Sequence, residues 1–119
     1  TLFFAPTVLG KMAPTMAARD AEIFGPVACL YAFDDEDEVL QQANDTEAGL
    51  SAYVYTENRD RLLRFARAME AGVVGANSAN IFANDLPFGG IKQSGIGREH
   101  GADCLDEYTE IKSICLGSS

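Results

Sequence analysis

Residues 86–97 read LPFGGIKQSGIG, and Arg98 and Glu99 follow directly. Four glycines within nine residues, behind a proline, exclude an ordinary helix or strand. Glycine is used where the backbone takes positive φ or passes close to another group. The spacing matches neither G-x-x-x-x-G-K-[ST] nor a G-x-G-x-x-G directly after a strand, which disfavours a phosphate loop. The glycine spacing alone therefore favours a closely packed structural crossover, which we expect to lead into a helix over residues 98–108.

The rest of the chain predicts alternating strands and helices. Apolar, β-prone runs indicate strands at residues 2–9, 27–33, 51–56 and 73–77. Between them we expect one helix from about 34 to 44, capped by Asp34 or Asp35, and another from Asn58 to about 71, stopped by Gly72. The acidic residues 34–38 suit a solvated first helical turn better than a cation site. This order is the signature of an α/β layer with parallel strands, so the predicted fold class is α/β.

Composition narrows the functional class. The chain has 119 residues, 47% of them hydrophobic, and a net charge of −9. Such acidity argues against nucleic-acid partners, and no apolar run is long enough to span a membrane. Cys29, Cys104 and Cys115 are odd in number and form no C-x-x-C pair, which favours a reducing, cytoplasmic setting. His100 is the only histidine, so no metal site is expected.

Five motifs, taken in order, carry a resemblance that each alone would not support. They are EIFGP at 22–26, ANDTEAGL at 43–50, GVVGAN at 72–77, PFGGIKQSGIGRE at 87–99 and YTEIK at 108–112. The ordered set resembles the C-terminal portion of the NAD(P)-dependent aldehyde dehydrogenases, from about Phe3 to the end of the chain. The amino-acid sequence of residues 43–50 and 91–99 is most similar to that of the succinate-semialdehyde branch.

The resemblance implies a division of the chain. Residues 1–108 would be the later half of the catalytic domain, a parallel-rich sheet with flanking helices. Residues 109–119 would be a C-terminal oligomerisation strand that joins a sheet shared across the subunit interface of a homo-oligomer. The chain opens Thr1-Leu2 in what reads as a strand, so we also expect it to be a piece of a longer protein.

Two residues are candidates for cofactor binding. Glu22 lies just ahead of a Gly25-Pro26 turn that would hold its carboxylate in place, and carboxylates accept hydrogen bonds from ribose hydroxyls. The resemblance implies that Glu22 binds the nicotinamide ribose of NAD or NADP and that Phe24 packs near the nicotinamide ring. From the residues alone, Glu22 could instead be a surface carboxylate beside a core phenylalanine.

The other candidates concern catalysis and the aldehyde. Glu99 is interpreted either as a residue of the first helical turn or, as the resemblance implies, as part of a proton relay. Asn77, Phe82 and Phe88 match the positions that line the family's aldehyde pocket, although the two rings could simply be core. A succinate-semialdehyde site is expected to carry a hydroxyl residue where this chain has Phe82, which leaves apolar aldehydes open as substrates.

The resemblance also defines what this chain lacks. The family oxidises an aldehyde or semialdehyde to the acid with NAD(P)⁺, using a cysteine nucleophile in a G-Q-x-C-type segment. Cys29, Cys104 and Cys115 have no such context, and the general-base glutamate and the nucleotide-binding domain are absent as well. We therefore expect the chain alone to be inactive. The alternative is a truncated, non-enzymatic module that folds and self-associates through its terminal strand.

Overall fold

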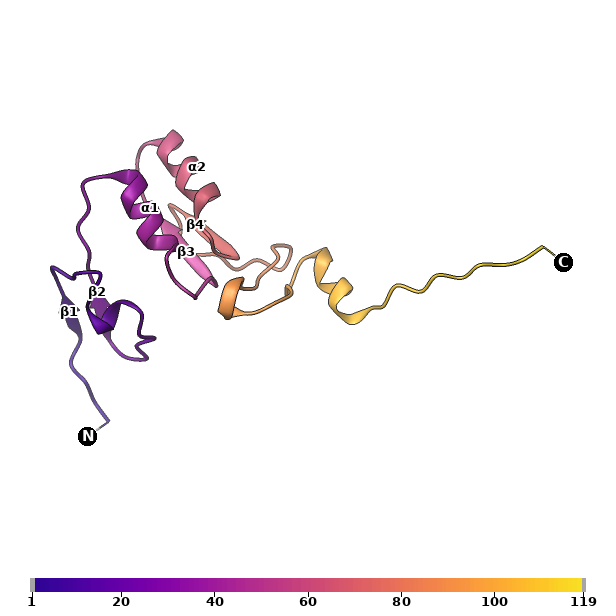
Figure 1. Ribbon diagram of the computed structural model, residues 1–119, viewed down its shortest axis with the longest axis horizontal. Helices are drawn as coiled ribbons and strands as arrows, with labels where there is room; N and C mark the ends of the chain where they lie inside the picture. Colours follow the sequence, from indigo (N-terminus) through magenta and orange to yellow (C-terminus); the bar gives the residue numbers. More distant parts are fainter. Residues whose placement is uncertain (1, 119) are drawn as a thin grey trace. The chain divides into compact units, whose positions relative to one another are not determined.

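The computed structural model describes residues 2–118, which form two compact units, residues 2–46 and 47–118. Thr1, the first residue of the predicted catalytic part, and Ser119, the last residue of the predicted oligomerisation strand, lie outside the described residues. The first unit contains β1 (Thr7–Leu9), the 3-10 helix η1 (Ala17–Arg19), β2 (Val27–Cys29) and α1 (Glu36–Asn44) (Figure 1). The second contains β3 (Ser51–Val54), α2 (Arg59–Ala68), β4 (Val73–Ala76) and the 3-10 helices η2 (Lys92–Ser94) and η3 (Ala102–Tyr108).

The first unit is built on a short parallel strand pair. β1 and β2 pair from Thr7 opposite Val27 to Leu9 opposite Cys29. The Thr7 amide donates to the Pro26 carbonyl at 2.8 Å, which opens the ladder. Both strands are shorter than the runs predicted from sequence, since a β-prone run is a strand only where a neighbour supplies ladder hydrogen bonds.

Two polar contacts organise α1 within the same unit. Asp35 is the N-cap and accepts from the amides of Asp37 and Glu38 at 3.0 and 2.8 Å, as one of the two predicted caps. At the other end, the Arg19 guanidinium donates to the Asp45 carboxylate at 2.6 Å and to its carbonyl at 2.9 Å. The hydrogen bond to Asp45 raises the pKa of Arg19 above its ordinary value. η1 is thereby tied to the end of α1.

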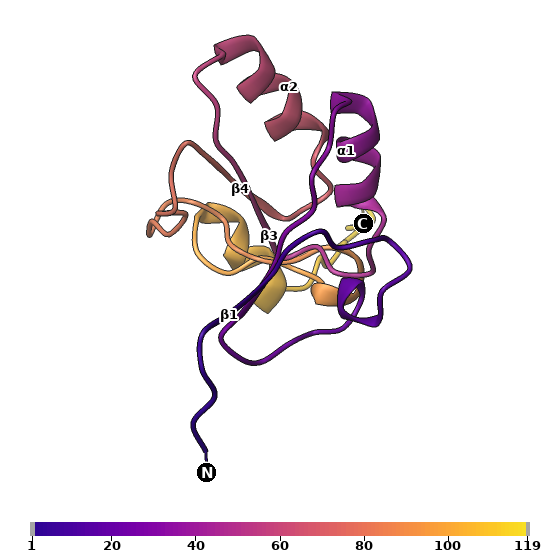
Figure 2. The same cartoon turned by 90° about the vertical axis from the view of Figure 1, so that its left-hand side faces the viewer.

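The second unit is a parallel β3–α2–β4 crossover. β3 and β4 pair from Ser51 opposite Val73 to Val54 opposite Ala76, and α2 packs against both strands (Figures 1 and 2). Asn58 caps α2 as predicted, accepting from the Arg61 amide at 3.0 Å. The helix ends at Ala68 with Met69 already extended, so the prediction that Gly72 stops it was wrong.

Close backbone packing explains the glycines of this unit. A side chain on Gly72 would collide with the carbonyl of Gly89, and one on Gly75 would collide with the carbonyl of Ser78. Next to these contacts lie Val73 and Ile81, which are 7% and 6% exposed and are the buried hydrophobic side chains among residues 2–118. Of the glycines between residues 86 and 97, Gly89, Gly90 and Gly97 are closely packed as predicted, whereas Gly95 is in open space. The small core sits where β4 meets the chain that follows it.

The described elements differ from the predicted ones mainly at residues 98–108. Within the described part the strands form two parallel pairs, one in each compact unit. The helix expected over residues 98–108 is a 3-10 helix that begins only at Ala102, because His100 and Gly101 have φ of 60° and 64°, which no right-handed helix contains. Residues 109–116 pair with no described strand and lie exposed, with Ile111 fully accessible, so the oligomerisation strand stays a prediction. None of the helices described is long and apolar enough to cross a membrane.

Candidate functional site

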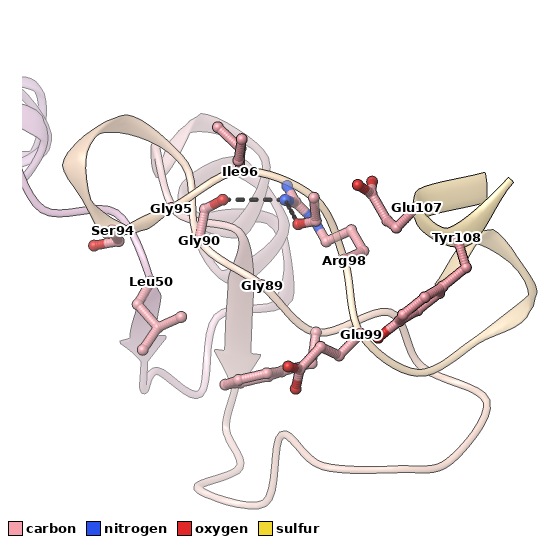
Figure 3. Close-up of a pocket in the computed structure, with 12 residues that line it drawn as sticks. Leu50, Gly89, Gly90, Ser94, Gly95, Ile96, Arg98, Glu99, Glu107 and Tyr108 are labelled. Carbon is pink, nitrogen blue, oxygen red and sulfur yellow. Dashed lines mark hydrogen bonds between the residues drawn. The ribbon is translucent and has the colours of Figure 1, made fainter. Parts of the chain in front are cut away.

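Residues 88–99, which we call the glycine loop, close on themselves. The Phe88 amide donates to the Glu99 carbonyl and the Glu99 amide to the Phe88 carbonyl, both at 2.7 Å, as an isolated antiparallel bridge. Next to this bridge, Nη1 of Arg98 donates to the Gly90 carbonyl at 3.1 Å and to the Gly97 carbonyl at 2.6 Å (Figure 3). These bonds join the two ends of the loop and hold Phe88 directly opposite Glu99.

A cavity of about 330 Å³ opens along this loop. Its wall is formed by residues 88–90 and 94–99, by Leu50 at the entry to β3, and by Glu107 and Tyr108 of η3. Figure 3 shows Glu107 and Tyr108 reaching from η3 toward the chain at Arg98 and Glu99. The cavity therefore combines a guanidinium, two carboxylates and two aromatic rings, a set that can bind a small polar molecule with an apolar portion.

The structure brings three of the predicted site residues together. Phe88 and Glu99 both line the cavity, although they are eleven positions apart in the chain. Phe82 packs on Phe88 with ring centroids 4.9 Å apart and an interplanar angle of 39°. Phe82 remains 60% exposed, while Phe88 is half-buried, so Phe82 is not enclosed in a core within residues 2–118. The interpretation of these rings as core residues is therefore wrong for Phe82.

Asn77 is engaged elsewhere. Its φ is 52°, its side-chain oxygen accepts from the Thr56 amide at 2.8 Å, and its side-chain nitrogen donates to the Thr56 carbonyl at 2.9 Å. The amide thus prolongs the β3–β4 ladder by one rung and does not line the cavity. A role for Asn77 toward substrate stays a prediction.

Glu99 is not a helix-start residue. It lies in the bridge with Phe88, three residues before η3 begins at Ala102, and its side chain is exposed. Its carboxylate therefore gains nothing from a helix N-terminus. Of the two interpretations of Glu99, the helix-start one was wrong, and the proton relay remains untested.

Glu22 and Phe24 lie in the first unit, on a tight turn. The Gly25 amide donates to the Ile23 carbonyl at 3.0 Å, and the Val27 amide donates to the Gly25 carbonyl at 2.8 Å. The turn leaves the Phe24 ring 92% exposed and the Glu22 carboxylate accessible. The Glu22 carboxylate can accept hydrogen bonds from ribose hydroxyls, and the Phe24 ring can pack against an aromatic ring attached to that ribose. The two residues are therefore chemically suited to a nicotinamide nucleotide.

The cysteines contribute no nucleophile to the cavity. Cys29 is half-buried with its thiol against the Ala18 carbonyl at 4.0 Å, while Cys104 is half-buried and Cys115 exposed. None of the three lines the cavity. Residues 2–118 also contain no group of three or more histidine, cysteine or acidic side chains that could hold a metal ion.

Three residues that form the glycine loop or the cavity were not predicted as site residues from the sequence. Arg98 closes the loop, Ser94 accepts from the Gly49 amide at 2.8 Å, and Tyr108 forms one wall. All three lie inside motifs that the sequence analysis identified, at residues 87–99 and 108–112. Membership of these motifs was the only feature of the sequence that pointed to them. Their partners lie up to 45 residues away, and no local pattern identifies such partners.

Comparison with known proteins places this site in context. A sequence model described as the aldehyde dehydrogenase family matches residues 1–114. The chain is 48% identical over 116 residues to a non-phosphorylating aspartate-semialdehyde dehydrogenase of Halomonas elongata, covering 98% of this chain and 24% of that protein. It is 47% identical to a probable NADP⁺ succinate-semialdehyde dehydrogenase of Sinorhizobium fredii, covering 97% and 23%.

A comparison with solved structures finds the same family. The chain superposes on an NAD⁺ complex of aldehyde dehydrogenase from Bacillus cereus with a TM-score of 0.88 and 44% identity, over 94% of this chain and 23% of that one. The chain thus spans about a quarter of the length of the relatives it matches.

Proposed function

This chain belongs to the aldehyde dehydrogenase family, and on that basis we propose that it acts as the C-terminal part of an enzyme that oxidises a semialdehyde to the corresponding acid with NAD⁺ or NADP⁺. Residues 1–108 serve as the later half of the catalytic domain and residues 109–119 as an oligomerisation strand. The three unpaired thiols fit a cytoplasmic protein.

The names of the relatives support a semialdehyde as substrate. Two relatives with nearly half of their matched residues identical are named for aspartate semialdehyde and succinate semialdehyde. Both molecules carry a carboxylate at the end opposite the aldehyde. An aldehyde with an anionic end is therefore the substrate class we propose, in preference to an apolar aldehyde.

The observation that carries the proposal is the pairing of Phe88 with Glu99 at the cavity. The pair sets an apolar ring and an exposed carboxylate side by side, with Phe82 stacked behind the ring. We propose that Phe82 and Phe88 line the path of the aldehyde and that Glu99 relays a proton to solvent. Asn77 contributes from the end of β4, where its backbone amide is bonded to Val54.

In the first unit, Glu22 and Phe24 form the part of the cofactor site that this chain supplies. Glu22 accepts from the ribose hydroxyls and Phe24 packs near the nicotinamide, which accepts hydride when bound. The choice between NAD⁺ and NADP⁺ rests on the adenosine ribose, for which we assign no residue in this chain. No cysteine here acts as nucleophile, so the 119 residues alone are proposed to be inactive.

Steady-state kinetics of the complete gene product test the proposal. Reduced nicotinamide is followed by absorbance with succinate semialdehyde and with butanal, which has the same carbon number but no carboxylate. We expect kcat/KM at least tenfold higher for the semialdehyde, and no turnover by the 119-residue chain. Equal or greater kcat/KM for butanal would overturn the substrate class. Turnover by the 119 residues that a single cysteine-to-alanine change abolishes would overturn the assignment of the nucleophile.

The tail supports a second proposed property, homo-oligomerisation. Ile111, Ile114 and Leu116 are 100%, 74% and 91% exposed, and an apolar segment without a strand partner is prone to pair with another chain. Light scattering should show an oligomer that is lost when residues 109–119 are deleted. If the deletion leaves an oligomer of unchanged mass, the tail is not the interface. Self-association of the 119-residue chain, without turnover by the complete gene product, would favour the non-enzymatic module.

A further inference from the structure

The backbone of Gly49 joins three segments of the second unit. Its carbonyl accepts from the amides of Gly72 and Ile91, both at 2.9 Å, and its own amide donates to Oγ of Ser94 at 2.8 Å. Gly49 lies two residues before β3, Gly72 directly precedes β4, and Ile91 and Ser94 belong to the glycine loop. The backbone of Gly49 therefore ties the glycine loop to the starts of both strands. Of the three hydrogen bonds that do so, only the one to Ser94 involves a side chain.

The contact at Gly49 leaves no space for adjustment. Gly49 is buried, and a Cβ added there would lie 2.8 Å from Cγ1 of Ile91 and 3.0 Å from its carbonyl oxygen. A Cβ on Gly90 would lie 2.6 Å from Cβ of Ser94. Ser94 is exposed, but its Cβ lies against Gly90 on the opposite side of the loop while its hydroxyl accepts from the Gly49 amide.

Neighbouring contacts hold the turn that presents Ser94. The Gln93 amide donates to the Glu47 carbonyl at 2.9 Å, and Nζ of Lys92 lies 2.7 Å from Oε2 of Glu70. Lys92 has a φ of 54°, a left-handed conformation that a lysine keeps only where surrounding contacts enforce it. The η2 segment is thus anchored at each of its three residues.

Beyond Ser94, within residues 2–118, the loop is held only to itself, by Arg98 and by the Phe88–Glu99 bridge. Gly95 has a φ of 141° and would meet nothing within 4 Å if it carried a Cβ, and Ile96 is 99% exposed. The next side chain that holds the loop is Arg98, whose two hydrogen bonds both end on the loop itself. Ser94 is accordingly the last side-chain link between the sheet and the arm, residues 95–99, that carries Glu99 to Phe88.

We propose that Ser94 is a positioning residue for the aldehyde side of the site: its hydroxyl, which accepts from the Gly49 amide, fixes the glycine loop, with its bridged pair Phe88 and Glu99, relative to the β3–β4 sheet. This inference rests on the proposed function, because Glu99 and Phe88 are its site residues. The cofactor residues Glu22 and Phe24 belong to the other unit, so their contribution should not depend on Ser94.

The test is Ser94→Ala in the complete gene product. Misplacing a catalytic group by a fraction of an ångström is enough to slow turnover markedly. We expect kcat/KM for the aldehyde to fall by about tenfold, while KM for the nicotinamide cofactor stays within about twofold of the parent. Hydrogen exchange at the Gly49 amide should accelerate by about tenfold, since its acceptor is gone.

Two controls separate positioning from a general loss of stability. Asn58→Ala in the same unit also removes one side-chain-to-backbone hydrogen bond, the N-cap of α2, and should reproduce the stability loss without changing either kinetic parameter. Ser51→Ala removes an exposed hydroxyl two residues from Gly49 and should change nothing. Ser94→Thr, which keeps the oxygen acceptor, should recover most of the aldehyde kcat/KM.

The outcomes distinguish this inference from the proposed function. Faster exchange at Gly49 together with unchanged aldehyde kinetics would show that the hydrogen bond forms but positions nothing, and would overturn the inference. Equal losses for aldehyde and cofactor in Ser94→Ala, matched by Asn58→Ala, would do so as well. If the parent protein oxidises no aldehyde, the proposed function fails, and this inference fails with it even where exchange at Gly49 confirms the hydrogen bond.

Discussion

The two parallel strand pairs of this protein have the same pairing and different surroundings. β1 and β2 pair over three residues, none of them buried, and Val8 is 67% exposed. β3 and β4 pair over four residues, and β4 contains Val73, which is 7% exposed. β3 is joined to β4 by a ten-residue helix that packs on both strands, whereas the connection from β1 to β2 contains only the three-residue η1.

The difference shows what stabilises a parallel pair. Ladder hydrogen bonds are present in both pairs, so they do not account for the burial seen in only one of them. A parallel pair needs its faces covered, and a helical crossover supplies that cover from within the chain. The β3–β4 pair, with α2 and the glycine loop against it, should therefore dominate the stability of the described chain, and substitutions there should have larger effects than matched ones at β1–β2.

The largest effect is expected for Gly72→Ala compared with Gly10→Ala. A Cβ on Gly72 collides with the Gly89 carbonyl, whereas one on Gly10 meets nothing within 4 Å. We expect the first change to lower the free energy of unfolding by about 3 kcal/mol and the second to leave it within about 0.5 kcal/mol of the parent. Urea unfolding followed by circular dichroism measures both. Equal midpoints for the two variants would contradict the comparison.

A smaller effect is expected for Val73→Ala compared with Val8→Ala. Val73 is buried beside the contact of Gly72 with Gly89, so its truncation removes buried methyl groups and opens a cavity, at about 2 kcal/mol. Val8 is largely exposed, so its truncation should change the free energy of unfolding by less than about 0.5 kcal/mol. Thermal unfolding of the two variants side by side decides the matter. A larger loss for Val8→Ala would show that β1–β2 carries the main core.

The smallest effects are expected for the two helix caps. Asn58→Ala and Asp35→Ala each remove a cap worth about 1 kcal/mol to its own helix. Because α2 covers β3–β4, loss of the Asn58 cap should also speed hydrogen exchange in those strands. Loss of the Asp35 cap should speed exchange in α1 alone. Exchange mass spectrometry resolves the two patterns, and a spread of faster exchange from α1 into β1 and β2 would contradict this assignment.

Sequence reasoning succeeded where the cause is local. Asp35 and Asn58 were predicted as caps because a short polar side chain bonds amides two or three residues ahead. The parallel pairing of β3 with β4 followed from the alternation of apolar strands with an amphipathic helix. The close packing of the glycines followed from their number and spacing. The caps depend on residues two or three positions apart, and the strand, helix and glycine patterns are each read within one short segment, so the sequence contains this information.

Sequence reasoning failed where distant contacts decide. Residues 98–108 look helical by composition, but Glu99 is taken into a bridge with Phe88 and the helix starts only after Gly101. The contact of the Asn77 side chain with Thr56, 21 residues away, had no local signal either, while a role of Asn77 toward substrate stays a prediction. A long-range hydrogen bond of a strand end or loop outweighs a weak local preference, because a buried or shared backbone group left unpaired costs more than the preference is worth.

By itself, the sequence determined the family, the α/β class, the two helix caps and the close packing expected of the glycine loop. The tertiary structure alone decided that Phe88 and Glu99 meet at one cavity with Phe82 stacked on Phe88, and that the Asn77 side chain bonds to Thr56. It also decided that Ser94 reaches Gly49 across 45 residues. The physical reason is the same in each case. Local preferences depend on neighbours along the chain, whereas a site is formed by hydrogen bonds and contacts between segments that only the folded backbone brings together.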